Sequence, residues 1–362
     1  MNAARYIFKF GAASSSPGYS DTPFLFWIVR YLLIGAIFFL FLIDWKRLQP
    51  IEWTGFGILV ISSAHAANTT NSHLVQIAAF HLLLAAALFA IVRSADREIT
   101  VSYVSHLTKA LTILAISAVV FLIFQLFLYF VFDVLPSHSH KNTILIRFGS
   151  ILDDSLAFGI FLPMFVGFFF YGLKDDFAKS TILMCTITIA VLTGSLTAMA
   201  TTALYTIWLL RGKLVLFLAW GLMLALLLFA FRWYFHELFS AKSGSIAGHI
   251  GSVSILAGDQ GAKLESGGFA ESGWVLIIKN FGFPAVFLML GLHTYVYFLC
   301  RRFLKVISHS KRFVGATDGL NFSALVASIN LPVIMIFPVY LLLALFSAIL
   351  LNMAEKSNSE NM

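Results

Sequence analysis

Long apolar runs follow one another along nearly the whole chain, and they constrain its fold more than any other feature. A helix that crosses a bilayer needs about 20 apolar residues, and about ten runs approach that length. Hydrophobic residues make up 60% of the sequence and charged residues only 11%, whereas soluble proteins have roughly 45–50% and 25%. This composition excludes a soluble enzyme, a disordered protein and a disulfide-rich secreted domain. The runs are residues 24–43, 51–67, 74–92, 110–134, 155–173, 180–194, 197–210, 214–231, 273–298 and 322–351.

The chain is therefore predicted to be an all-α polytopic membrane protein with about 10–11 transmembrane helices. It forms a single integral membrane domain over residues 1–362. The number of helices depends on the last run, which contains Pro332 and Pro338. These prolines allow either one long kinked helix or two helices with a break at residues 330–332.

The net charge of +7 is interpreted as a signal for membrane orientation and lipid headgroups, not for nucleic-acid binding. Basic residues concentrate in the loops of one side, which are predicted to be cytoplasmic. The opposite side, the outer face, contains segment 135–154, the turn 194–198 and the long Gly- and Ser-rich loop 232–272. The cytoplasmic loops are residues 44–50, 93–109, 174–179, 211–213 and 299–321.

Motifs of soluble catalysis are absent, since the sequence has no phosphate-binding Gly-rich loop, GxGxxG, HExxH or GxSxG pattern. Cys185 and Cys300 lie in apolar runs and are predicted to be small core residues without a disulfide or a metal role. His138 and His140 form an HxH pattern, but a metal site needs more ligands than stand nearby. No metal and no cofactor are expected. Histidines in the spans, such as His293, are interpreted as packing or hydrogen-bonding groups.

The first candidate site is a stripe of polar residues where the outer loop enters the fifth run. Arg147, Ser150 and Asp154 have the i, i+3, i+7 spacing of one helix face, and Asp153 is adjacent to the stripe. An Arg at this depth suits a phosphate group because its planar fork donates two hydrogen bonds at once. The alternative is an Arg147–Asp154 ion pair that only anchors the helix.

The second candidate site lies in and beside the loop 232–272. His249 is flanked by glycines, and a neutral imidazole could accept a proton from a sugar hydroxyl. Glu271 stands at the outer mouth of the ninth run, and Lys279 is predicted to lie about two turns deeper inside it. The alternatives are a solvated loop histidine, a Glu that caps the helix and a Lys that extends to the interface.

Three stretches, taken in this order, resemble the O-antigen ligase and polymerase superfamily of bacterial membrane glycosyltransferases. They are IRFGSILDDSLAFGIFLPMFV (146–166), LTGSLTAMATTALYTIWLLRGK (192–213), and GHIGS (248–252) followed by AESGWVLIIKNFGFPAVFLML (270–290). Their order, spacing and common outer placement carry the resemblance over roughly residues 140–350. Leu196 stands where the family's second motif has an Arg.

The resemblance implies a metal-independent transferase in the bacterial inner membrane, with its active site facing the periplasm. The donor would be a glycan on undecaprenyl pyrophosphate, and Arg147 would neutralise the leaving pyrophosphate with help from Lys141 or Lys279. His249 or Glu271 would orient or deprotonate the attacking hydroxyl. The family motifs also place Ser150, Asp153, Asp154 and Ser195 at the substrate-binding site. Membrane lipids and a chain-length regulator are the further partners that it implies.

Several functions remain open at the level of sequence. A polymerase would transfer the glycan to another carrier-linked repeat unit, whereas a ligase would transfer it to lipid A core. GHIGS favours the polymerase. A non-enzymatic transporter or flippase is a further alternative, although no paired halves of the kind found in transporters are visible. An inactive accessory subunit is the last alternative, because of Leu196.

Overall fold

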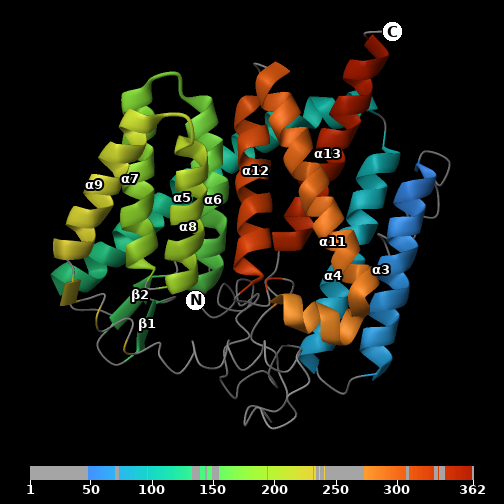
Figure 1. The fold of residues 1–362 in the computed structure, drawn as a ribbon, viewed down its shortest axis with the longest axis horizontal. Helices are drawn as coiled ribbons and strands as arrows, with labels where there is room; N and C mark the ends of the chain where they lie inside the picture. The colour runs from blue at the N-terminus through green and yellow to red at the C-terminus, as the bar shows by residue number, and fades with distance from the viewer. Residues whose placement is uncertain are drawn as a thin grey trace.

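The computed structural model describes two thirds of the chain as a bundle of helices with one small β-hairpin (Figure 1). The helices are α3 (Pro50–Thr69), α4 (His73–Ser94), α5 (Arg97–Phe132), α6 (Ser155–Gly172), α7 (Asp176–Leu192), α8 (Leu196–Leu210), α9 (Leu214–Ala230), α11 (Gly273–Val306), α12 (Lys311–Ala327) and α13 (Val339–Glu360). The strands are β1 (Ser139–Asn142) and β2 (Leu145–Phe148). The residues described are 48–69, 73–95, 97–132, 139–142, 145–148, 155–193, 195–230, 232–233, 236, 240, 273–306, 310–329, 333 and 339–360.

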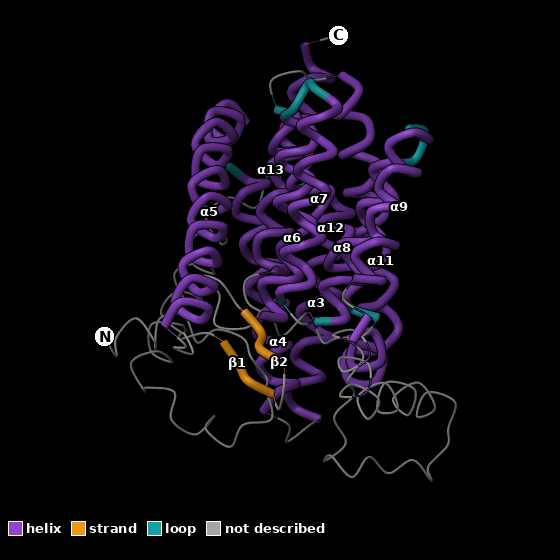
Figure 2. The backbone as a smooth tube through the Cα atoms, turned by 90° about the vertical axis from the view of Figure 1, so that its left-hand side faces the viewer, coloured by secondary structure: helices purple, strands orange, loops and turns teal. Residues whose placement is uncertain are grey.

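Successive helices run in alternating directions, so the bundle has two distinct ends (Figure 1). The hairpin end contains β1, β2 and the first turns of α6 and α8, at Ser155 and Leu196. The basic end contains the turns 173–175 and 211–213 and the first turn of α12. Figure 2 shows the hairpin at the same end as the last turns of α5. The turns 173–175 and 211–213, which were predicted to belong to the basic side, both lie at the basic end, whereas residues 97–109 of the predicted loop 93–109 belong to α5.

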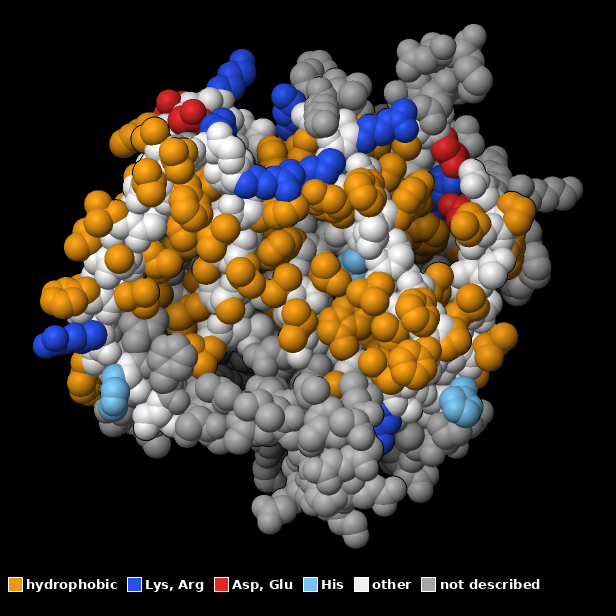
Figure 3. Space-filling view, in the orientation of Figure 1, with side chains coloured by type: hydrophobic (Ala, Val, Ile, Leu, Met, Phe, Trp, Pro, Cys, Tyr) orange, Lys and Arg blue, Asp and Glu red, His pale blue; other side chains and the backbone are white. Residues whose placement is uncertain are grey.

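Side chains on one face of the bundle match this division. Lys and Arg form a band across the basic end, above a wide field of hydrophobic side chains (Figure 3). In the first turn of α7, Asp176 accepts hydrogen bonds from Lys213 Nζ at 2.5 Å and Lys179 Nζ at 3.2 Å. These bonds lower the pKa of the Asp176 carboxyl below its usual value.

The centre of the bundle is the contact between α6 and α12, where glycines replace large side chains. A methyl group added at Gly315 would lie 2.3 Å from the carbonyl oxygen of Gly167, and one at Gly319 would lie 2.0 Å from that of Pro163. Ser323 Oγ also donates a hydrogen bond across the two helices to Ile160 O at 2.7 Å. Small residues four apart allow helix backbones to approach closely, as in membrane helix pairs.

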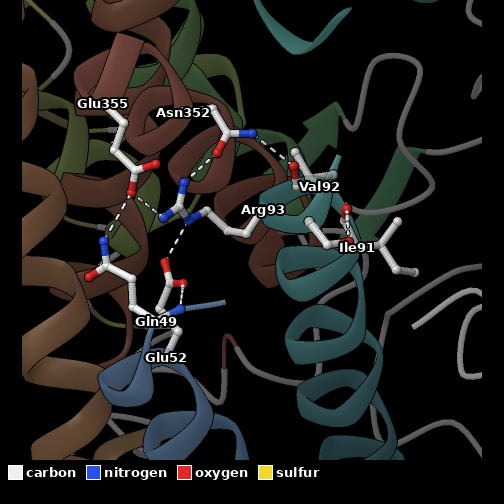
Figure 4. Close-up of polar contacts among 8 residues, drawn as sticks. Gln49, Glu52, Ile91, Val92, Arg93, Asn352 and Glu355 are labelled. Atoms are coloured by element: carbon white, nitrogen blue, oxygen red, sulfur yellow. Dashed lines mark hydrogen bonds and ion pairs between the residues drawn. The ribbon is translucent and has the colours of Figure 1, made fainter. Parts of the chain in front are cut away.

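At the basic end, Arg93 joins the last turn of α4 to α3 and α13 (Figure 4). Its Nε donates to Glu52 Oε1 at 2.5 Å, and its Nη2 donates to Glu355 Oε1 at 2.6 Å. Its Nη1 donates to Asn352 Oδ1. The side chain of Arg93 is buried, so its charge is stabilised by these partners instead of by water.

The structure confirms some sequence-based expectations and corrects others. The fold is all-α as predicted, with one small addition, the hairpin of β1 and β2 in the segment before α6. Residues 299–321 do not form a cytoplasmic loop: α11 continues to Val306 and α12 begins at Lys311. The last apolar run forms parts of two helices, α12 and α13, as the second alternative predicted. Cys300 is buried as expected, but Cys185 is exposed on α7.

Candidate functional site at the hairpin end

Arg147 lies on a β-strand and not on the helix face that its spacing predicted. In the antiparallel hairpin Arg147 pairs with His140, and Lys141 pairs with Ile146. The prediction that Arg147, Ser150 and Asp154 share one helix face is therefore wrong for Arg147. Residues 145–148 pair with β1 instead of forming a helical turn. Ser150, Asp153 and Asp154 lie outside the described residues.

The first turns of α6 and α8 lie against each other at this end. A methyl group added at Gly159 would lie 2.1 Å from the Cβ of Ala198, so the two backbones are in close contact. The N-terminus of a helix carries unpaired N–H groups and the positive end of the helix dipole, and both favour an anion. Two such ends therefore converge beside the segment that carries Arg147.

Ser195, predicted to bind substrate, is the N-cap of α8. Its Oγ accepts a hydrogen bond from Ala198 N at 3.3 Å, and the residue is buried. Thr193 Oγ1 accepts from Ser195 N at 3.4 Å. These contacts give Ser195 a structural role at the start of α8. Leu196, the residue at the position of the family's Arg, is the first residue of that helix.

Lys279 is not deep in a continuous span, because α11 is broken after it. Gly282 has a left-handed φ of 81° and a ψ of 168°, and Pro284 follows. Figure 1 shows the segment before the break lying across the hairpin end. Lys279 is exposed on this segment, so it faces the surroundings of the bundle and not its interior.

The segment before the break is fixed to the last turn of α12. Trp274 N donates to Ser328 O at 3.1 Å, and Trp274 Nε1 donates to Leu325 O at 3.3 Å. These bonds satisfy carbonyl groups that have no partner within α12. The two remaining predicted residues, His249 and Glu271, lie outside the described residues, as do residues 241–272 as a whole.

The structure also shows a buried charge network that the sequence analysis missed. Asp318 of α12 is 2% exposed, and its Oδ2 lies 2.8 Å from Arg301 Nη2 of α11. Tyr205 of α8 donates its hydroxyl to the same Oδ2 at 3.0 Å, and Arg301 Nη1 donates to Tyr171 Oη of α6 at 2.9 Å. Four helices therefore meet at one ion pair near the basic end.

The network was missed because both ionic residues fell in the segment assigned to a cytoplasmic loop. The pattern Gly315-x-x-x-Gly319 around Asp318 was the available signal, since it is typical of a closely packed membrane helix. Nearer the hairpin end, His293 Nδ1 lies 2.7 Å from Asn321 Oδ1, and His293 is buried. The prediction that His293 is a hydrogen-bonding histidine is confirmed.

The chain has no match among protein-family models, and no curated protein and no solved structure is significantly similar to it. The described residues contain no group of three His, Cys, Asp or Glu side chains that could hold a metal ion.

Proposed function

We propose that this protein is a polytopic membrane glycosyltransferase that polymerises glycan repeat units carried on undecaprenyl pyrophosphate. One observation carries the proposal: two helix N-termini, those of α6 and α8, abut beside the hairpin that contains Arg147. Both helices belong to stretches that resemble the O-antigen polymerases. A converging pair of helix N-termini with an adjacent Arg suits a pyrophosphate leaving group.

Membrane insertion is supported by helix length and by exposed apolar surface. Among the described residues, two helices are long and apolar enough to cross a bilayer, Ser102–Phe132 and Gly273–Leu304, the second with its break at Gly282. Along the first of these, Ile116, Ile123 and Phe130 are exposed, the last by 73%. Exposed apolar surface of this extent is typical of a lipid-facing helix. By the positive-inside rule the basic end faces the cytoplasm and the hairpin end faces the periplasm.

In the proposed reaction an acceptor sugar hydroxyl attacks the anomeric carbon of the donor glycan. The new bond joins the acceptor oxygen to that carbon, and the bond between the carbon and the phosphate oxygen breaks. Undecaprenyl pyrophosphate leaves with the electron pair, and Arg147 with the two helix ends stabilises its charge. Lys141 or Lys279 assists, and the hydroxyl proton passes to His249 or Glu271.

The test is transfer between purified carrier-linked repeat units in detergent. Arg147→Ala should abolish long-chain product. Arg147→Lys should retain part of the activity, because it keeps the positive charge but loses the planar guanidinium that donates two hydrogen bonds at once. Arg232→Ala is the matched control, since Arg232 is a basic residue of the outer side that packs over Phe229. Full-length product from Arg147→Ala would leave Arg147 with a structural role only.

The acceptor decides between two versions of this function. A polymerase extends carrier-linked glycan, whereas a ligase requires lipid A core in the same assay. The polymerase is preferred because of the GHIGS motif.

A lipid-linked sugar transporter is the second candidate, because α11 is broken at Gly282 and Asp318 is buried between helices. Broken helices and buried ionisable groups are common at transport sites. Substrate movement across sealed vesicles without any product linkage would favour this candidate.

A further inference from the structure

At the basic end, two guanidinium groups converge on one indole ring. Trp208 of α8 has Arg211 Cζ at 3.5 Å from its ring centroid and Arg301 Cζ at 5.2 Å. Arg301 also lies 5.3 Å from the ring centroid of Tyr297. The rings of Trp208 and Tyr297 are 5.6 Å apart, and that of Phe322 is 6.5 Å from Trp208. Helices α8, α11 and α12 thus build one aromatic and cationic surface.

The positive charge of this surface exceeds its negative charge. Asp318 pairs with Arg301, but no described carboxylate lies within ion-pair distance of Arg211. Arg301 Nε is buried and has no hydrogen-bond acceptor among the described residues. That nitrogen is inside the bundle and its two neighbours, Nη1 and Nη2, donate to Tyr171 and Asp318, so Arg301 contributes its charge and Arg211 contributes free donors. One net positive charge beside an aromatic ring suits an anion.

The surroundings of the two arginines are apolar and exposed. Leu204 and Ile207 on α8 and Phe298 on α11 are exposed large hydrophobic residues, Phe298 by 62%. Figure 3 shows the basic band directly above such a hydrophobic field. A free phosphate would contact only the arginines, whereas a phosphate with a hydrocarbon chain would contact both the arginines and the exposed apolar side chains. The ligand that fits is therefore an amphipathic anion.

We infer that Arg211 and Arg301 bind the phosphate of an anionic phospholipid from the leaflet at the basic end. The headgroup lies against Trp208, and an acyl chain lies along Leu204, Ile207 and Phe298. Basic pockets between membrane helices on the cytoplasmic side recognise anionic lipids in this way. The inference rests on the membrane placement of the proposed function but not on glycan transfer, since the site lies at the opposite end of the bundle from Arg147.

The test is native mass spectrometry of the full chain, titrated in detergent with phosphatidylglycerol or with phosphatidylcholine. The wild type should retain one phosphatidylglycerol molecule that Arg211→Gln binds about fivefold more weakly, because one basic residue contributes modestly at a membrane surface. Phosphatidylcholine should not be retained at this site. Arg232→Gln is the matched control, since it removes an Arg that packs on an aromatic ring at the other end.

Three outcomes would overturn the inference. Equal retention by the wild type and Arg211→Gln would exclude Arg211 from the site. Equal retention of the two lipids would show that no anion is recognised. Displacement of the lipid by inorganic phosphate alone would reveal a free-phosphate site without a lipid chain. Glycan transfer, measured on the same Arg211→Gln sample, should remain at the wild-type rate, so failure of this site and failure of the proposed activity are distinguishable.

Discussion

Single buried charges connect helices that are far apart in the sequence. Arg93 joins three helices at the basic end, and the Asp318–Arg301 ion pair joins four. Each charge is buried only together with its partners, because an isolated charge in an apolar interior is very costly. Such networks fix which helices are neighbours, although a buried ion pair is weak evidence for high stability.

We expect Asp318→Asn to destabilise the protein by about 3 kcal/mol, since it leaves Arg301 without its carboxylate in a largely buried position. Tyr205→Phe should cost about 1 kcal/mol, because it removes one hydrogen bond. The double variant Asp318→Asn with Arg301→Gln should recover part of the loss. A double-mutant cycle of unfolding in detergent measures the coupling between Asp318 and Arg301. Strictly additive effects of Asp318→Asn and Arg301→Gln would contradict the ion-pair assignment.

Among the elements, α6, α8 and α9 were predicted to within a few residues because each is an apolar run that ends at polar or basic turn residues. The α12 helix was missed because its neighbours surround it on most sides, so small and polar residues take the place of an apolar face. The break in α11 depends on the φ of Gly282, which Pro284 alone does not specify. The hairpin was missed because the Arg147–Asp154 spacing happens to match a helix period.

The close contact of α6 and α12 predicts a strong effect of one added methyl group. Gly315→Ala should destabilise the protein by about 1–3 kcal/mol, because the new Cβ would overlap the backbone of Gly167. Gly291→Ala is the matched control: apart from its own helix backbone, nothing lies within 4 Å of its added Cβ, so the change should be neutral or stabilising by about 0.5–1 kcal/mol. Thermal unfolding in detergent compares the two variants. Equal stability of both would mean that the helices do not touch at these glycines.

At the scale of the whole molecule, the two proposed sites lie at opposite ends of one bundle. The alternation of helix directions could be predicted from the apolar runs and from the basic loops, since each span reverses the chain. Which residues form the candidate site at the hairpin end could be predicted only in part. Arg147 and Ser195 both lie at the hairpin end, but their local structures depend on contacts between segments that no single stretch of sequence contains.

The last prediction is that the hairpin end and the basic end face opposite sides of the membrane. In a background with Cys185 and Cys300 replaced by Ala, a Cys at Asn142 of β1 should react with a membrane-impermeant thiol reagent in intact spheroplasts. A Cys at Lys174, an exposed residue in the turn between α6 and α7, should react only after lysis. We expect this pattern of labelling because the Lys and Arg residues of the basic end would be costly to move across the membrane, so that end should remain in the cytoplasm.

Each alternative result of the labelling has a definite structural meaning. If only Lys174→Cys reacts in intact cells, the orientation of the protein is the reverse of the predicted one. Arg147 would then lie on the side of the membrane opposite to a periplasmic donor. Reaction of both residues in intact cells would mean that the two ends are not separated by a bilayer. The proposed glycan transfer would then lose its donor, and the lipid site at Arg211 would lose the leaflet that supplies its ligand.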